Sequence, residues 1–303
     1  MIEAVRVTTQ RGESLTMELS HPEKCGLLIS EVDGISTGDA TVNITDFGVL
    51  DGGVFNSARI GTRNITISFY YLFYPDIETA RHIAYYYFPV KERVELAFIT
   101  DHRTIVTSGY VESNDTMIFS QQESGQVSIL CPDPFFHDEV KKSVSLNSVG
   151  AEFEFPFSNE SLDEKLICFG DFITDGTMQI NYGGDVTTGL TMIINFLSSE
   201  VDHLRIVNTN ENTEFDLDIR NMESSYGITI VRDDQIVIST VRGNRYIKYV
   251  HGAEETNLLG YYYDTISWFQ LTPGLNNFYI ESNTQDLSEV NIKIEYDTIY
   301  GGV

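Results

Sequence analysis

The stretch Val127–Phe136 constrains this chain most, because it begins as a β-strand and cannot continue as one. Val127 and Ile129 share one face of a β-type alternation that is rich in β-branched residues. Two prolines then remove backbone N–H donors and hold the residues before them in extended conformations. We therefore expect the strand to end here and its stiff exit to act as a pivot between two domains. The pivot residues are Pro132, Asp133, Pro134, Phe135 and Phe136.

The length of the chain fits two domains on either side of that pivot. Its 303 residues provide enough sequence for two separate cores. A polar run follows the two phenylalanines. The sequence thus predicts a first domain over residues 1–140, a linker over residues 141–150 and a second domain over residues 151–303.

The balance of charge is strongly acidic. The chain has 19 Lys and Arg residues against 45 Asp and Glu residues, a formal net charge of −26, and the acids occur throughout. Such a surface repels phosphate and argues against non-specific binding of nucleic acid. No apolar run approaches the roughly 18 residues of a membrane span, and Met1–Glu3 does not begin a signal peptide.

Strand patterns dominate both halves. In the first half, Asn64–Leu72 alternates most clearly, and Val42–Ile44 is a shorter strand before a flexible loop at Asp51–Gly53. One helix is expected at about residues 76–88, capped by Asp76 and ended by Pro89. The second half shows no helical period, and its strands recur about every ten residues, which is typical of a β-sandwich. Ile228–Ile230 and Ile236–Ile238 predict a hairpin around Asp233 and Asp234.

Catalytic and metal-binding patterns are absent from the sequence. It contains no phosphate-binding glycine motif, no nucleophile elbow and no His pair with zinc spacing. The three cysteines, Cys25, Cys131 and Cys168, lack metal-ligand spacing and are expected to be buried free thiols in a reducing compartment. We therefore expect no enzyme activity, no metal and no cofactor.

An aromatic run in the second half is the candidate for binding. Exposed aromatic rings stack on sugars or anchor a protein partner, whereas buried rings fill a sandwich core, and the sequence leaves both readings open. The residues are Tyr261, Tyr262, Tyr263 and Trp268.

Several stretches, taken in order, resemble the distal tail protein (Dit) family of long-tailed bacteriophages and prophages. They are the Asp51–Gly52 loop before Arg63–Ile67, the helix that contains Arg81, the strand Ser108–Val111, the exit Val127–Phe136, the segment Asn181–Asp185, and the turn Trp268–Asn276. The hairpin at Arg232–Gln235 is more highly charged than in that family.

This resemblance implies a mainly β structural protein of the virion. The first domain would be a tail-tube-like β-barrel or sandwich with one helix, and the second a galectin-like β-sandwich. Six copies would form a ring at the tail tip or baseplate, made in the bacterial host cytoplasm, and DNA would pass through its lumen without specific binding. The implied partners are the tail tube protein, the tail-associated lysin or fibre hub protein, and a receptor-binding protein. The alternatives are a carbohydrate-binding adhesion module and a tail-tube subunit.

Overall fold

The computed structural model divides the chain into two compact units. The first comprises Met1–Val140 and Ile299–Val303, and the second comprises Lys141–Thr298. The structure describes residues 1–48, 50–73, 76–146, 148–150, 171–173, 176–199, 201–262, 267–283 and 287–303. The final five residues therefore return to the first unit, whereas the sequence placed them in the second domain.

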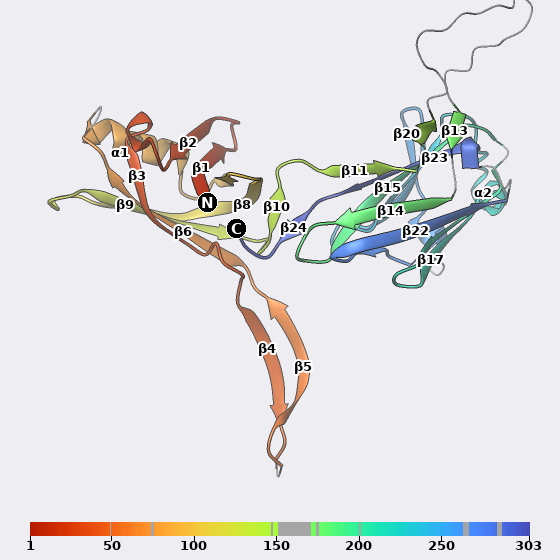
Figure 1. Ribbon diagram of the computed structural model, residues 1–303, viewed down its shortest axis with the longest axis horizontal. Coiled ribbons are helices and arrows are strands. Elements are labelled where there is room, and N and C mark those ends of the chain that lie inside the picture. The colour runs from red at the N-terminus through yellow and green to blue at the C-terminus, as the bar shows by residue number, and fades with distance from the viewer. Residues whose placement is uncertain are drawn as a thin grey trace, which may run out of the picture. The chain divides into compact units, whose positions relative to one another are not determined.

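The first unit is built on one antiparallel sheet of nine strands. Its main path runs in the order β2-β1-β7-β8-β9-β6-β3, and β10 and β24 pair beside it (Figure 1). The strands are β1 (Ile2–Thr9), β2 (Ser14–Glu18), β3 (Leu27–Asp33), β6 (Arg63–Tyr71), β7 (Arg93–Thr100), β8 (Thr104–Met117), β9 (Ser124–Cys131), β10 (Phe136–Asp138) and β24 (Ile299–Tyr300). A short 3₁₀ helix spans Pro22–Lys24.

A single α-helix covers one face of this sheet, as the sequence predicts. Helix α1 spans Ile77–Tyr87, and the Asp76 side chain accepts the backbone N–H of Thr79 at 2.8 Å. Ala80 and Ala84 are fully buried and belong to the same core as Ile65 and Phe69 of β6. These small residues allow the helix to pack closely on the sheet.

Two further strands of the first unit leave the sheet and pair with each other as a separate two-stranded sheet. They are β4 (Ala40–Asp46) and β5 (Gly53–Ile60), which form an antiparallel ribbon that we call the arm. Figure 1 shows the arm extending away from the sheet, below the point where β3 and β6 meet it. The sequence predicted a strand at Val42–Ile44 but missed β5, because it indicated only a flexible loop at Asp51–Gly53 and no strand after it.

The second unit contains two packed sheets that share one core. The larger sheet has seven strands: β11 (Lys142–Ser145), β23 (Val290–Tyr296), β15 (Thr188–Phe196), β18 (Gln235–Ser239), β19 (Tyr246–His251), β20 (Glu254–Asn257) and β21 (Gln270–Leu271). The other sheet has four: β14 (Thr177–Tyr182), β22 (Gly274–Ser282), β16 (His203–Asn208) and β17 (Thr213–Asp218). A separate pair joins β12 (Ser148–Gly150) to β13 (Asp171–Ile173).

Three expectations for this half need correction. The predicted linker over residues 141–150 contains β11, which pairs with β23, and β12. Short helices occur at α2 (Ile219–Tyr226) and α3 (Leu259–Tyr262), and a 3₁₀ turn at Leu287–Glu289, where no helical period was visible. Ile228–Ile230 forms no strand, and β18 instead pairs with β15 and β19.

Candidate partner-binding surfaces

The arm carries an apolar face that is exposed to solvent. The pairing register places Ile44 opposite Phe55 and Val42 opposite Ala58, so these side chains lie on one side of the ribbon. Ile44 and Phe55 are 59% and 62% exposed. Every residue of both strands is exposed. A two-stranded ribbon with an uncovered apolar face is marginally stable in water, so this surface is suited to contact with another protein.

The opposite face of the arm is mostly polar, although Val54 lies on it opposite Thr45. Asn43 and Ser57 are paired across the strands, and the Asn43 amide donates to the Ser57 hydroxyl at 2.9 Å. The Asn56 amide donates to the Thr45 hydroxyl at 2.6 Å beside the bulge between Asn43 and Ile44. The arm is therefore amphipathic, with one side suited to water and the other to a protein surface.

A second apolar surface lies at the opposite end of the sheet from the arm root, by which we mean the loop between β3 and β4 and the start of β6 at Arg63. Phe73, Met117 and Phe119 are 78%, 68% and 100% exposed. Thr116, the neighbour of Met117, is hydrogen-bonded to both Tyr71 and Tyr85 at 3.1 Å. The β6–β9 register pairs Arg63 with Cys131 and Tyr70 with Ser124, which places the arm root and this surface at opposite ends of β6.

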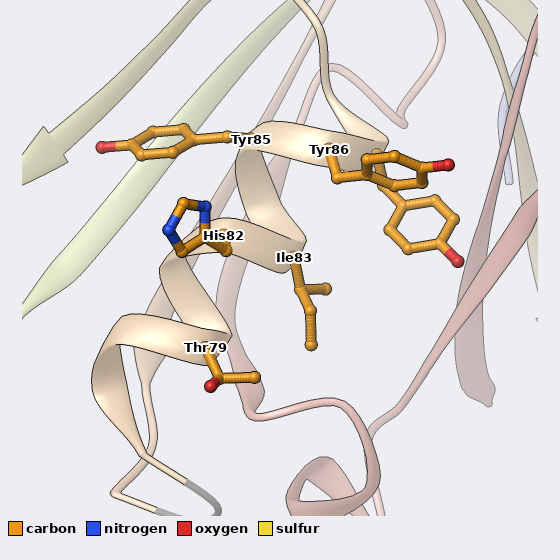
Figure 2. Close-up of a pocket in the computed structure, with 6 residues that line it drawn as sticks. Thr79, His82, Ile83, Tyr85 and Tyr86 are labelled. Atoms are coloured by element: carbon orange, nitrogen blue, oxygen red, sulfur yellow. The ribbon is translucent and has the colours of Figure 1, made fainter.

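Helix α1 presents aromatic side chains to solvent above this end. Figure 2 shows His82 and Tyr85 projecting from one side of the helix, and Ile83 and Tyr86 projecting from the other. They line a shallow hollow of about 480 Å³. Tyr86 also donates to the Glu13 carboxylate in the β1–β2 connection. The hollow is mostly apolar and open, which fits a protein contact better than an enclosed ligand.

The predicted pivot residues belong to the structure of the first unit. Phe136 is fully buried, packs edge-to-face on Phe98 with ring centroids 5.8 Å apart, and lies 4.6 Å below the Arg63 guanidinium. Phe135 is half-buried, and Pro132 is exposed. Because β10 pairs with β8 and β24, the chain after Pro134 is anchored in this sheet and is not an unpaired exit. That anchoring makes Phe136 a core residue of the first unit.

Asp133 fixes the turn between the two prolines. Its carboxylate accepts the Phe135 N–H at 3.0 Å and lies 3.0 Å from Nε2 of His137. Burial acts to raise the pKa of Asp133, but these hydrogen bonds outweigh it and hold the pKa below its ordinary value. The carboxylate is thus bound to its own loop in the ionised form.

The predicted aromatic binding run is largely occupied in packing. Tyr262 is buried against Phe215, with centroids 5.5 Å apart, and burial raises its pKa far above the ordinary value. Tyr261 packs edge-to-face on Tyr226 and Tyr262. The Arg245 guanidinium lies 5.1 Å from the Trp268 ring, and Tyr263 is outside the described residues. The geometry therefore favours the core reading for Tyr262 over a sugar platform.

Asp234, in the charged turn where the sequence departs from the family pattern, is a buried anchor. Its carboxylate accepts the Val231 N–H at 2.8 Å and the Tyr249 hydroxyl at 2.7 Å, and lies 2.6 Å from Nδ1 of His251. Burial acts to raise its pKa, yet the hydrogen bonds from Tyr249 and Val231 hold it below the ordinary value. No sequence motif marked this group, because its side-chain partners, Tyr249 and His251, lie 15 and 17 residues later on β19.

The described part of the chain offers no grouping for metal chemistry. Among those residues, no three His, Cys, Asp or Glu side chains are placed to hold an ion. Cys25 and Cys131 are buried free thiols, as predicted, and burial raises the pKa of both. Cys168 lies outside the described residues. Within the same described ranges, no helix has the length and apolar character of a membrane span.

Comparison with known proteins identifies the fold. No protein-family model and no curated protein sequence matches this chain. The crystal structure of the Dit protein of phage SPP1 matches with a TM-score of 0.61 and 11% identity, over 96% of this chain and 98% of that one. That protein is described as a paradigm of the hub adsorption apparatus in phages that infect Gram-positive bacteria.

Two structures of the activated phage p2 baseplate, with strontium and with calcium, match with lower scores. Their TM-scores are 0.44 and 0.42 at 10% and 11% identity, over 96% and 97% of this chain and 97% and 98% of theirs.

The molecule thus has a two-unit, mainly β fold of the kind found in phage tails. More specifically, it has the distal tail protein (Dit) fold, which SPP1 Dit shares along nearly the whole chain. The resemblance in sequence predicted this fold, and the structural likeness confirms it.

Proposed function

We propose that this chain is a structural distal tail protein of a phage or prophage. Six copies form a ring through their first units, between the tail tube and the tail tip or baseplate. The likeness to SPP1 Dit supports this role, because it extends over both units and that protein belongs to a hub. A tail-tube subunit needs only the first of the two folds, so the second unit favours the hub.

The observation that carries the proposal is the uncovered apolar face of the arm. Side chains such as Ile44 and Phe55 gain stability only when a protein surface removes them from water. In a ring, each arm meets a different surface of the next copy, and the rotation closes the assembly. The arm thereby acquires the cover that a single chain lacks.

The face of the sheet directed away from the α1 core suits the lumen of this ring. Asn64, Ser68, Gln126, Ser128 and Glu112 lie there on β6, β9 and β8. The Ser128 hydroxyl is hydrogen-bonded to Asn64 at 3.0 Å and to Glu112 at 3.1 Å. Arg93 of β7 is a basic residue on the same face, whereas the five groups named above are neutral or acidic and offer DNA phosphates no attachment, so DNA passes without specific binding.

The remaining surfaces serve the other partners in this proposal. The tail tube protein and the tail-associated lysin or fibre hub protein bind the ring, and the second unit anchors a receptor-binding protein. The role is assembly within the virion and requires no catalytic activity. We assign no carbohydrate site to the aromatic run, because Tyr262 is buried.

Light scattering after size-exclusion chromatography tests the ring. We expect the wild-type chain to elute at about six times its monomer mass of 34.2 kDa. Ile44→Lys with Phe55→Lys places two charges on the apolar face and should yield monomers. The matched control, Asn43→Lys with Ser57→Lys, charges the polar face of the same ribbon and should leave the ring intact. A wild-type chain that stays monomeric at high concentration contradicts the proposal.

A further inference from the structure

A buried arginine joins three segments of the chain at the root of the arm. Arg63, the first residue of β6, is 6% exposed. Its Nε donates to the Pro134 carbonyl at 2.6 Å, and Nη1 donates to the carbonyls of Gly34, at 2.6 Å, and Ser36. Its Nη2 donates to the Gly301 carbonyl at 2.8 Å. These four hydrogen bonds connect the β3–β4 loop, the exit after β9 and the segment that follows the second unit.

The segment Ile299–Val303 is itself part of this root. The Val303 N–H donates to the Ile35 carbonyl at 2.9 Å, so it binds the same β3–β4 loop that Arg63 holds. A Cβ added at Gly302 would lie 3.1 Å from both the Ile35 oxygen and the Thr37 nitrogen. Tyr300 is buried, and its hydroxyl donates to Asp138 at 3.0 Å. The segment therefore fits closely against the loop from which β4 begins.

Because Arg63 is charged and buried, its stability depends on all three segments being in place. A guanidinium taken out of water is stable only when its donors are satisfied, and burial lowers the pKa of Arg63 below its ordinary value. All four acceptors are backbone carbonyls, so they are present only when the three segments are folded against one another. A lysine ammonium has one centre and cannot span the same fork of acceptors.

We propose that Arg63 and the segment 299–303 form a lock that holds the arm root, and that the arm is ready for assembly only when this lock is closed. The arm is made early in the chain, whereas the Gly301 acceptor and the Val303 donor follow the whole second unit. A nascent chain with a finished arm thus lacks two of the hydrogen bonds at its root. This consequence for assembly rests on the ring role of the arm; the lock itself does not.

Hydrogen exchange of the intact protein tests the lock directly. Two variants open it from opposite sides: Arg63→Gln, and a chain that ends at Tyr300 and so keeps β24. We expect the strand amides on either side of the root loop, at Val32–Asp33 of β3 and Ala40–Val42 of β4, to exchange on the order of tenfold faster in both, because each variant removes hydrogen bonds that hold the loop between them. Arg63→Lys should give most of the same increase, since the ammonium keeps the charge and loses the fork. The matched control is Arg93→Gln, since exposed Arg93 bonds only the Ser108 hydroxyl among the contacts described.

The shortened chain keeps Arg63 and buried Tyr300, so it reports on the lock even where Arg63→Gln fails to fold. Wild-type protection of Val32–Asp33 and Ala40–Val42 in that chain overturns the proposal, as does an equal loss of protection in Arg93→Gln. Light scattering on the same samples separates the two claims. A wild-type chain that forms no ring contradicts the ring, while its exchange still measures the lock. A shortened chain that exchanges faster and still forms rings at the wild-type concentration overturns the assembly part of the proposal.

Discussion

The arm and the β18–β19 hairpin of the second unit have a similar alternation of apolar residues, but these residues are exposed in the arm and buried in the hairpin. In the hairpin, Ile236, Ile238 and Ile247 alternate with half-buried residues and are packed into the sandwich core. In the arm, Val42, Ile44 and Phe55 share one face and stay exposed. Alternation therefore specifies that an apolar face exists, and the surrounding structure decides what covers it. For the hairpin the cover is the same chain, whereas for the arm we expect a neighbouring copy.

The largest difference in stability is expected between substitutions of a buried and an exposed phenylalanine. Phe136→Ala removes a fully buried ring and should destabilise the first unit by about 3–5 kcal/mol. Phe119→Ala alters a fully exposed ring and should change stability by less than about 0.5 kcal/mol. Far-UV circular dichroism during urea unfolding measures both effects.

The single tryptophan, Trp268, lies in the second unit and supplies the control. Its fluorescence transition should be unchanged in both variants. Equal effects of Phe136→Ala and Phe119→Ala would show that burial in the isolated chain does not govern their contributions.

The same substitution in the two hairpins gives the next largest difference. Ile247→Ala should destabilise the second unit by about 2–5 kcal/mol, because Ile247 is fully buried. Ile44→Ala in the arm should change the unfolding of dilute subunits by less than about 0.5 kcal/mol and instead weaken assembly. Trp268 fluorescence follows the first change, and light scattering across a dilution series follows the second. A large unfolding effect of Ile44→Ala in dilute monomers would mean that the arm is covered within its own chain.

The smallest expected effect on stability comes from Asp234, the buried carboxylate at the start of the β18–β19 hairpin. The folded pKa of Asp234 lies below its ordinary value, so its stabilisation is present above the unfolded carboxyl pKa and is lost as pH falls through the folded value. Asp234→Asn should cost about 1–3 kcal/mol at pH 7, and the difference from wild type should shrink below about pH 4. Urea titrations followed by Trp268 fluorescence at several pH values measure this. A difference that stays constant down to pH 3 would contradict the role of the ionised carboxylate.

Local signals predicted much of the first unit and missed features that depend on contacts distant in sequence. The helix was predictable because Asp76, the spacing of Ala80 and Ala84, and Pro89 act within one short segment. Strand β5 was missed because the bulge opposite Asn43 and Ile44 interrupts its alternation. The Asp51–Gly52 pair between two strand-like runs was the available signal for a hairpin.

The candidate surfaces were less predictable, for the same reason. Tyr262 and Trp268 have the chemistry of a binding platform, and only tertiary packing shows that Tyr262 is buried on Phe215. Arg63 was marked by the family resemblance, but its four carbonyl partners come from loops up to 238 residues away. Sequence patterns indicate which side chains can bind. The fold decides which of them are free to do so.

The two ends of the second unit lie next to each other, so another domain could take its place between the two parts of the first unit. Strand β11 begins it, β23 comes near its end, and the two pair directly, with Lys142 opposite Tyr296. The Lys141 ammonium lies 3.3 Å from the Asp297 carboxylate just outside that pair. A domain whose ends are adjacent can be inserted into a host domain without pulling it apart. A different domain with neighbouring ends could therefore replace residues 141–298 while the first unit keeps its fold.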